Sequence, residues 1–204
     1  MKMRGFYGVV DNPASIAEAV ALAGQLSVDG GACAVQLRVK RGSTRAFVEL
    51  ARALVAAVAV PFIVNDRLDV ALVAGAAGVH LGQDDLPLAA ARRAAPGLLI
   101  GVSTHDPQQA AEAARAGADY LGFGPIFATA TKDNPDPVQG LEGLALAVQA
   151  AGSVPVVAIG GITPAHAAAI AATGAAAACA ISAVNGAPDV ASAARVIATA
   201  FRRG

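Results

Sequence analysis

Short runs rich in valine, isoleucine and leucine alternate with longer alanine-rich runs that carry polar residues on one side, and the alternation repeats eight times. Each short run predicts a strand, and each amphipathic run after it predicts a helix. The predicted strands are Phe6–Val10, Ala34–Arg38, Pro61–Asn65, Gly78–Leu81, Leu99–Ser103, Tyr120–Gly124, Pro155–Ile159 and Ala176–Ser182. The predicted helices are Ser15–Gly30, Thr44–Ala57, Leu68–Ala74, Leu86–Ala95, Pro107–Ala116, Leu141–Ala151, Pro164–Thr173 and Pro188–Arg203.

The predicted strands are apolar along their length, which is typical of a parallel sheet covered on its outer face. Eight successive strand-helix units therefore predict an α/β fold, a closed (β/α)8 TIM barrel that spans residues 1–204 as a single domain. An open doubly wound sheet is the alternative, but Asp11, Asn12 and Pro13 stand where its glycine-rich fingerprint would follow the first strand. A barrel predicts that functional residues gather where the strands end.

The charge composition favours small molecules over polymers as partners. The chain has 15 Lys and Arg against 15 Asp and Glu, so neither a basic nucleic-acid surface nor a polybasic membrane contact is expected. The segment from Gly143 to Pro188 carries no Asp, Glu, Lys or Arg, but Pro155 and Gly160 help to divide it into pieces shorter than the roughly 20 residues of a membrane helix. With two cysteines, no CxxC pair and no apolar leader, we expect a cytoplasmic protein, whose oligomeric state, a homodimer included, stays open.

Three cationic residues at the predicted strand ends point to an anionic substrate. Arg38 and Lys40 are two positions apart along one strand direction, so both can face the barrel mouth, and Lys132 follows the sixth strand in the longest loop. The alternative is a solvated loop, above all for Lys132, which has Asp133 beside it.

Two carboxylates from neighbouring loops could bind a hard cation. Asp66 follows the third strand and Asp85 the fourth, and Mg²⁺ sites commonly combine one or two carboxylates with substrate phosphate oxygens. The alternatives are a helix cap at either residue, or a salt bridge between Asp66 and Arg67. Asp84 leaves open which of the two adjacent carboxylates points inward.

Glycines after the seventh strand could bind a phosphate through the backbone. Gly160 and Gly161 precede Thr163 and Pro164, where a helix is predicted to begin, so their N–H groups could approach an anion closely. A tight turn that needs glycine is the alternative. The sequence offers no Ser-His-Asp arrangement, no catalytic-cysteine context and no clustered His/Cys ligands.

The strand-end motifs, taken together and in order, resemble the thiamine phosphate synthase family from about Phe6 to the last helix. The motifs are Gln36-Leu37-Arg38-Val39-Lys40, Asn65-Asp66-Arg67, Gly78-Val79-His80-Leu81-Gly82-Gln83-Asp84-Asp85, Gly101-Val102-Ser103, Gly122-Phe123-Gly124-Pro125-Ile126-Phe127, Thr129-Ala130-Thr131-Lys132, Val157-Ala158-Ile159-Gly160-Gly161-Ile162 and Ile181-Ser182-Ala183. The resemblance implies a transferase that joins 4-amino-2-methyl-5-hydroxymethylpyrimidine pyrophosphate to 4-methyl-5-(2-phosphoethyl)thiazole.

The resemblance also implies a role for each matching residue. The pyrimidine pyrophosphate would contact Gln36, Arg38, Lys40, Asn65, Ser103 and Lys132, of which Arg38, Lys40, Ser103 and Lys132 would be catalytic. The Mg²⁺ ligands would be Asp66 and Asp85, which selects Asp85 over Asp84. The thiazole phosphate would contact Thr129, Thr131, Gly161, Ile181 and Ser182.

Two alternatives share the barrel. The related thiazole tautomerases use a His at the end of the sixth strand, where this chain has Pro125, and tend to lose the Thr-x-Thr-Lys run that is intact at 129–132. A non-catalytic phosphate-binding barrel could drop the carboxylates, yet both Asp66 and Asp85 are present. The first strand departs from the family, which more often has Leu and Thr where this chain has Gly8 and Val10.

Overall fold

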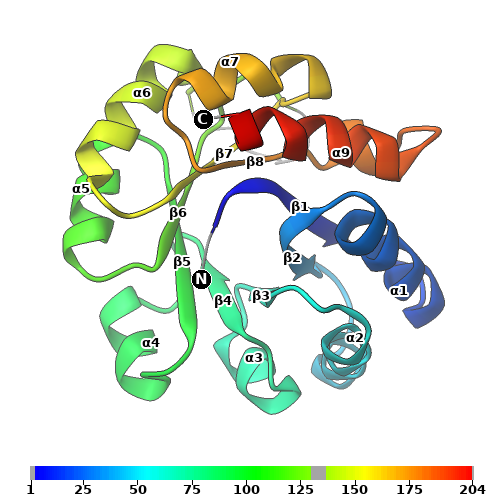
Figure 1. The fold of residues 1–204 in the computed structure, drawn as a ribbon. Coiled ribbons are helices and arrows are strands. Elements are labelled where there is room, and N and C mark those ends of the chain that lie inside the picture. Colours follow the sequence, from blue (N-terminus) through cyan, green and yellow to red (C-terminus); the bar gives the residue numbers. More distant parts are fainter. Residues whose placement is uncertain (1–2, 130–136, 204) are drawn as a thin grey trace.

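Eight parallel strands pair in chain order and close into a barrel, with β1 hydrogen-bonded to β8 (Figure 1). The computed structural model describes residues 3–129 and 137–203. Its strands are β1 (Gly5–Asp11), β2 (Ala32–Arg38), β3 (Phe62–Asn65), β4 (Gly78–Leu81), β5 (Leu99–Thr104), β6 (Tyr120–Phe123), β7 (Val156–Ile159) and β8 (Ala177–Cys179). The predicted (β/α)8 fold is confirmed.

The helices form a ring outside the strands (Figure 1). They are α1 (Ile16–Gly24), α2 (Thr44–Ala57), α3 (Leu68–Ala74), α4 (Leu88–Ala94), α5 (Pro107–Arg115), α6 (Gly140–Ala151), α7 (Ala167–Ala172), α8 (Ser182–Asn185) and α9 (Val190–Ala200). Capping residues start several of them: the Ser43 side chain accepts from Ala46 N–H before α2, and Asp106 accepts from Gln109 N–H before α5.

Two predicted boundaries are wrong in an informative way. The predicted helix Ser15–Gly30 is α1 followed by a π-helical turn, Gln25–Asp29. The predicted strand Ala176–Ser182 ends at Cys179, and Ser182 begins the short helix α8. The run from Ala175 to Ala180 is apolar at every position, so its periodicity does not separate strand from helix.

The strands bury two separate cores because successive side chains point to opposite faces. Outward residues such as Phe6 and Val10 pack under the helices, whereas the barrel interior holds a smaller cluster. The inner cluster is Met3, Tyr7, Val9, Ala34, Ile63, Tyr120, Val157, Ala177 and Cys179. Burial raises the pKa of the Cys179 thiol to about 12, which keeps it protonated and fits a packing role.

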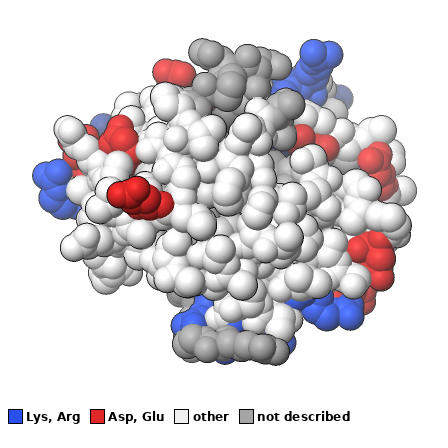
Figure 2. All heavy atoms as spheres, turned by 90° about the horizontal axis from the view of Figure 1, so that it is seen from above, with Lys and Arg blue, Asp and Glu red and all other residues white. Residues whose placement is uncertain are grey.

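The side of the barrel under α6, α7 and α9 is largely uncharged. Figure 2 views this side, and Lys, Arg, Asp and Glu are confined to its margins. Most of α6 and all of α7 belong to the charge-free segment from Gly143 to Pro188, and α9 follows it. Within the described ranges, no helix is long and apolar enough to cross a bilayer.

Candidate active site

One cavity opens at the end of the barrel where the strands finish, and every strand or the loop after it contributes to its wall. Eight of the predicted site residues line it: Gln36, Arg38, Asn65, Ser103, Thr129, Gly161, Ile181 and Ser182. The predicted contacts Thr131 and Lys132 lie outside the described residues. Lys40, Asp66 and Asp85 lie on loops after the neighbouring strands β2, β3 and β4.

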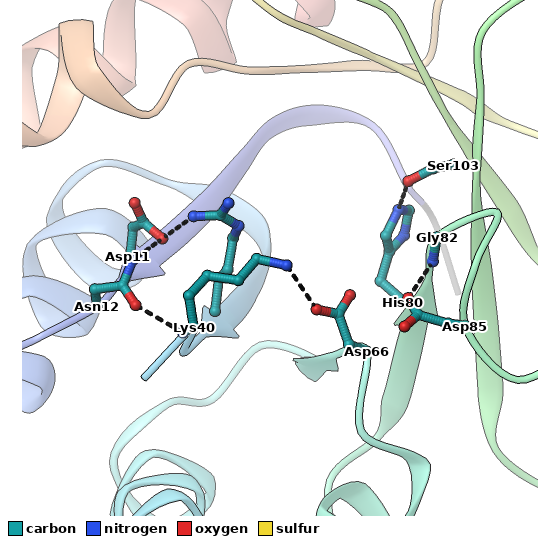
Figure 3. Close-up of polar contacts among 9 residues, drawn as sticks. Asp11, Asn12, Lys40, Asp66, His80, Gly82, Asp85 and Ser103 are labelled. Carbon is teal, nitrogen blue, oxygen red and sulfur yellow. Dashed lines mark hydrogen bonds and ion pairs between the residues drawn. The ribbon is translucent and has the colours of Figure 1, made fainter. Parts of the chain in front are cut away.

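The two cations at the end of β2 are each paired with a carboxylate at the end of a neighbouring strand (Figure 3). Arg38 Nη1 lies 2.6 Å from Asp11 Oδ1, and Lys40 Nζ lies 2.9 Å from Asp66 Oδ2. The Asn12 side chain also accepts from Lys40 N–H at 2.7 Å. These contacts hold both cationic side chains beside the cavity mouth, where an anion would compete for them.

The backbone at two loop residues directs these contacts. Asn12 has φ of 45° and Asp66 has φ of 64°, the left-handed region that Asn and Asp tolerate better than other side chains do. Asp66 N–H donates to His80 O at 2.8 Å, which ties the turn after β3 to β4. Such conformations cost free energy and often occur at functional sites.

Asp66 and Asp85 influence each other across this edge of the barrel. Partial burial and the adjacent Asp66 carboxylate raise the pKa of Asp85, while the Gly82 N–H, which donates to Asp85 Oδ2 at 2.7 Å, and Lys40 act in the opposite direction. Asp85 is half-buried and its neighbour Asp84 is exposed, so the two carboxylates differ in their environment. Neither alternative role for the pair is seen: Arg67 pairs with Asp69, and α3 and α4 have no side-chain cap.

These carboxylates suit a magnesium ion that also binds substrate. The negative charges of Asp66 and Asp85 repel each other, and this repulsion contributes to the raised pKa of Asp85. A hard cation bound between the two carboxylates would offset that repulsion. Among the described residues, no group of three or more His, Cys, Asp or Glu side chains is placed to hold a metal. The donor set therefore fits an ion that takes its remaining ligands from phosphate oxygens and water rather than from a protein cage.

The opposite wall, after β7 and β8, is built from backbone and uncharged residues. Gly160 and Gly161 have φ of 97° and 62°, and a Cβ at Gly161 would lie 2.8 Å from Phe127. The loop after β6 is held against these glycines, since Phe127 N–H donates to Gly160 O at 3.0 Å. Glycine is needed here for both the φ angle and the close approach of two backbones.

Several cavity residues are not among the predicted site residues. Tyr7, His80, His105 and Tyr120 line the wall, and Asp11 pairs with Arg38. His105 Nδ1 donates to Gly124 O at 2.6 Å, and His80 contacts side chains on β5 and β6. Alternation along β1 could have indicated Tyr7, because it shares an inward face with Val9.

Comparisons with known proteins agree with the motifs. A model of the family described as thiamine monophosphate synthase matches residues 6–184. The chain is 50% identical over 174 residues to a thiamine-phosphate synthase of Chloroflexus aurantiacus, covering 84% of this chain and 80% of that protein. It is 44% identical over 206 residues to one of Anaeromyxobacter dehalogenans, covering 100% and 90%.

Among solved structures, a thiamine phosphate pyrophosphorylase from Pyrococcus furiosus superposes with a TM-score of 0.85 at 37% identity, covering 98% of this chain and 96% of that one. These matches confirm the family and the transferase class that the strand-end motifs predicted. The chain belongs to the thiamine monophosphate synthase family.

Proposed function

We propose that the protein condenses 4-amino-2-methyl-5-hydroxymethylpyrimidine pyrophosphate with 4-methyl-5-(2-phosphoethyl)thiazole, giving thiamine phosphate and pyrophosphate. One observation carries this proposal: a single cavity has a charged wall with Arg38, Lys40 and Asp66 beside it, and an uncharged glycine wall across the barrel at Gly160 and Gly161. Two different phosphate-bearing molecules could therefore bind face to face.

The proposed chemistry is dissociative. The bond from the pyrimidine methylene carbon to oxygen breaks, and its electron pair leaves with pyrophosphate. The electron-rich aminopyrimidine stabilises the cation that remains, and the thiazole nitrogen lone pair forms the new carbon-nitrogen bond. No protein base is needed for this bond, which is consistent with a sequence that offers no Ser-His-Asp arrangement.

The residues of the charged wall would act on the leaving group. Arg38 and Lys40 would exchange their carboxylate partners for pyrophosphate oxygens and stabilise the negative charge that develops there. Asp66 and Asp85 would hold Mg²⁺, which supplies further charge stabilisation to the departing oxygens. The sequence adds Lys132 and Thr131 as expected contacts, outside the described residues.

The remaining predicted contacts would orient the two rings. Gln36, Asn65 and Ser103 would contact the pyrimidine substrate, and Thr129, Gly161, Ile181 and Ser182 would contact the thiazole phosphate. A soluble two-substrate reaction without polymer partners fits the balanced charge of the chain, and we place it in the cytoplasm.

The test is to mix both substrates with Mg²⁺ and follow thiamine phosphate by chromatography, with chelator as a control. Product formation that requires Mg²⁺ is expected, and its absence would refute the proposal. The same assay separates the alternatives: a tautomerase would isomerise the thiazole alone, although Pro125 stands where that branch has its His, and a binding protein would retain both ligands without product.

A further inference from the structure

A continuous line of side-chain hydrogen bonds crosses the barrel beneath the cavity. Gln36 Nε2 donates to Tyr7 Oη at 3.2 Å, and Tyr7 Oη lies 2.8 Å from Tyr120 Oη. Tyr120 Oη lies 3.1 Å from His80 Nδ1, and His80 Nε2 lies 3.0 Å from Ser103 Oγ. The line joins β2, β1, β6, β4 and β5, and each of its five residues also lines the cavity.

The interior is shaped to hold these rings. Tyr7 and Tyr120 are 4% and 1% exposed, and Gln36 is 6% exposed. A Cβ at Gly101 would overlap the Tyr120 ring, and one at Gly122 would lie 3.0 Å from His80 Cε1. Two strand positions therefore lack side chains where the rings lie, and this leaves the room that both rings need.

The hydrogen bonds have a consistent direction. Burial raises the pKa of both Tyr7 and Tyr120, so each hydroxyl keeps its proton at neutral pH. Since Tyr7 accepts from Gln36, we assign its own proton to Tyr120 and the Tyr120 proton to His80 Nδ1. This assignment leaves the ring proton of His80 on Nε2, from which it donates to Ser103 Oγ.

This direction determines what the two ends offer to a ligand. Both residues line the cavity, and in this assignment the Gln36 amide oxygen is left to accept from a ligand while the Ser103 hydroxyl is left to donate. An aminopyrimidine matches this pattern, because its amino group donates and its ring nitrogens accept. An oxopyrimidine would place a carbonyl oxygen against the Gln36 oxygen, and mismatched polar groups are rejected strongly in a buried site.

We propose that Tyr7, Tyr120 and His80 are positioning residues that orient Gln36 and Ser103 and so select a 4-aminopyrimidine over its 4-oxo analogue. The identity of the ring rests on the proposed function. Tyr7, Tyr120 and His80 need not touch the reacting atoms: they act by fixing the donor and acceptor directions of the two side chains at the ends of the line.

Tyr120→Phe tests the line at its centre. Without the Tyr120 oxygen, the Tyr7 proton has Gln36 as its remaining partner, and the amide turns to present its oxygen to Tyr7 and its NH₂ to the cavity. Calorimetry with the 4-amino and 4-oxo pyrimidine pyrophosphates, in Mg²⁺ and without thiazole, should show that the preference for the amino ring falls by about tenfold or more. Tyr7→Phe, which frees the same amide directly, should have a similar effect.

Ser27→Ala is the matched control. The Ser27 hydroxyl is buried and donates to Ala23 O at 2.6 Å in the turn after α1, outside the cavity wall. It should lower the Tm as a buried hydrogen-bond loss does, yet keep the wild-type preference. A wild-type protein that binds both rings equally, or two tyrosine variants that both keep its preference, would overturn the inference. Wild-type selectivity for the amino ring without thiamine phosphate formation would instead refute the proposed function and leave the positioning roles intact.

Discussion

The two walls of the cavity differ in how they would hold an anion. The wall after β2, β3 and β4 has Arg38, Lys40, Asp66 and Asp85, whereas the wall after β7 and β8 belongs to a segment without a charged residue. In the proposed reaction the pyrophosphate gains negative charge as the carbon–oxygen bond to the pyrimidine methylene breaks. The charge on the thiazole phosphate does not change during the reaction. Charged groups stabilise a transition state only where charge changes. In the proposed reaction the charged wall would therefore act on the leaving group, and the uncharged wall would serve to bind the thiazole phosphate.

The largest effect is expected from neutralising the carboxylates. Asp66→Asn or Asp85→Asn keeps the side-chain shape but removes a ligand charge, so turnover should fall on the order of a thousandfold. Thiamine phosphate formation, measured across a Mg²⁺ titration with both substrates saturating, gives the effect. Asp84→Asn is the control, since this exposed neighbour should keep wild-type turnover. The metal assignment fails if Asp85→Asn retains the wild-type Mg²⁺ response.

The next effect should come from Arg38. Arg38→Gln removes the guanidinium and leaves Asp11 without its cation, so kcat/KM for the pyrimidine substrate should fall about a hundredfold. The KM for the thiazole phosphate should stay within about twofold, because its wall contains no cation. Arg67→Gln removes an exposed arginine that pairs with Asp69, and it should change neither value. Equal losses for both substrates would contradict the division of the walls.

The sequence indicated which residues form the charged wall, but it did not indicate which cation pairs with which carboxylate. Arg38, Asp66 and Asp85 could be proposed from the sequence because they lie at or shortly after the ends of strands, and strand ends of a barrel share one face. The pairing of Arg38 with Asp11 was not predicted, because it depends on the register between β1 and β2, in which these two residues are partners. The contacts of Lys40 with Asn12 and Asp66 involve two residues with a left-handed backbone, and single positions of this kind have no periodic signal.

The interior was harder to predict for a different reason. A tyrosine in an apolar strand has the same periodicity whether its hydroxyl is hydrogen-bonded or only packed, so the sequence does not separate these two roles for Tyr7 and Tyr120. Their pairing depends on register around the barrel and on the space left by Gly101. The short helix α8 was missed because alanine-rich runs favour neither period.

A smaller effect is expected on the uncharged wall. Gly161→Ala puts a Cβ 2.8 Å from Phe127 at a φ of 62°, so either the glycine backbone or the loop after β6 must shift. The KM for the thiazole phosphate should rise about tenfold, with kcat/KM for the pyrimidine substrate less affected. Steady-state kinetics with each substrate varied in turn measures both.

Gly117→Ala separates the two effects of Gly161→Ala, which are the strain of a left-handed backbone and the close contact of the added Cβ. Gly117 has φ of 89° and nothing within 4 Å of an added Cβ. Both variants should lose about 1–2 kcal/mol of folding free energy from the left-handed backbone, measured by denaturant unfolding. Only Gly161→Ala should change the thiazole KM, and an equal rise in Gly117→Ala would mean that the effect is general destabilisation.

The smallest effect is expected from salt. Raising ionic strength from about 0.1 M to 1 M shortens the Debye length from roughly 10 Å to 3 Å, which weakens attraction between exposed charges. The side chain of Lys40 is 49% exposed, so the KM for the pyrimidine pyrophosphate should rise a few-fold at saturating Mg²⁺, compared with less than about twofold for the thiazole phosphate. Because the 15 basic and 15 acidic residues cancel, no long-range field of the protein obscures the difference between the walls. An equal rise for both substrates would show that the uncharged wall also depends on charge, and would locate that charge in a group outside the segment from Gly143 to Pro188.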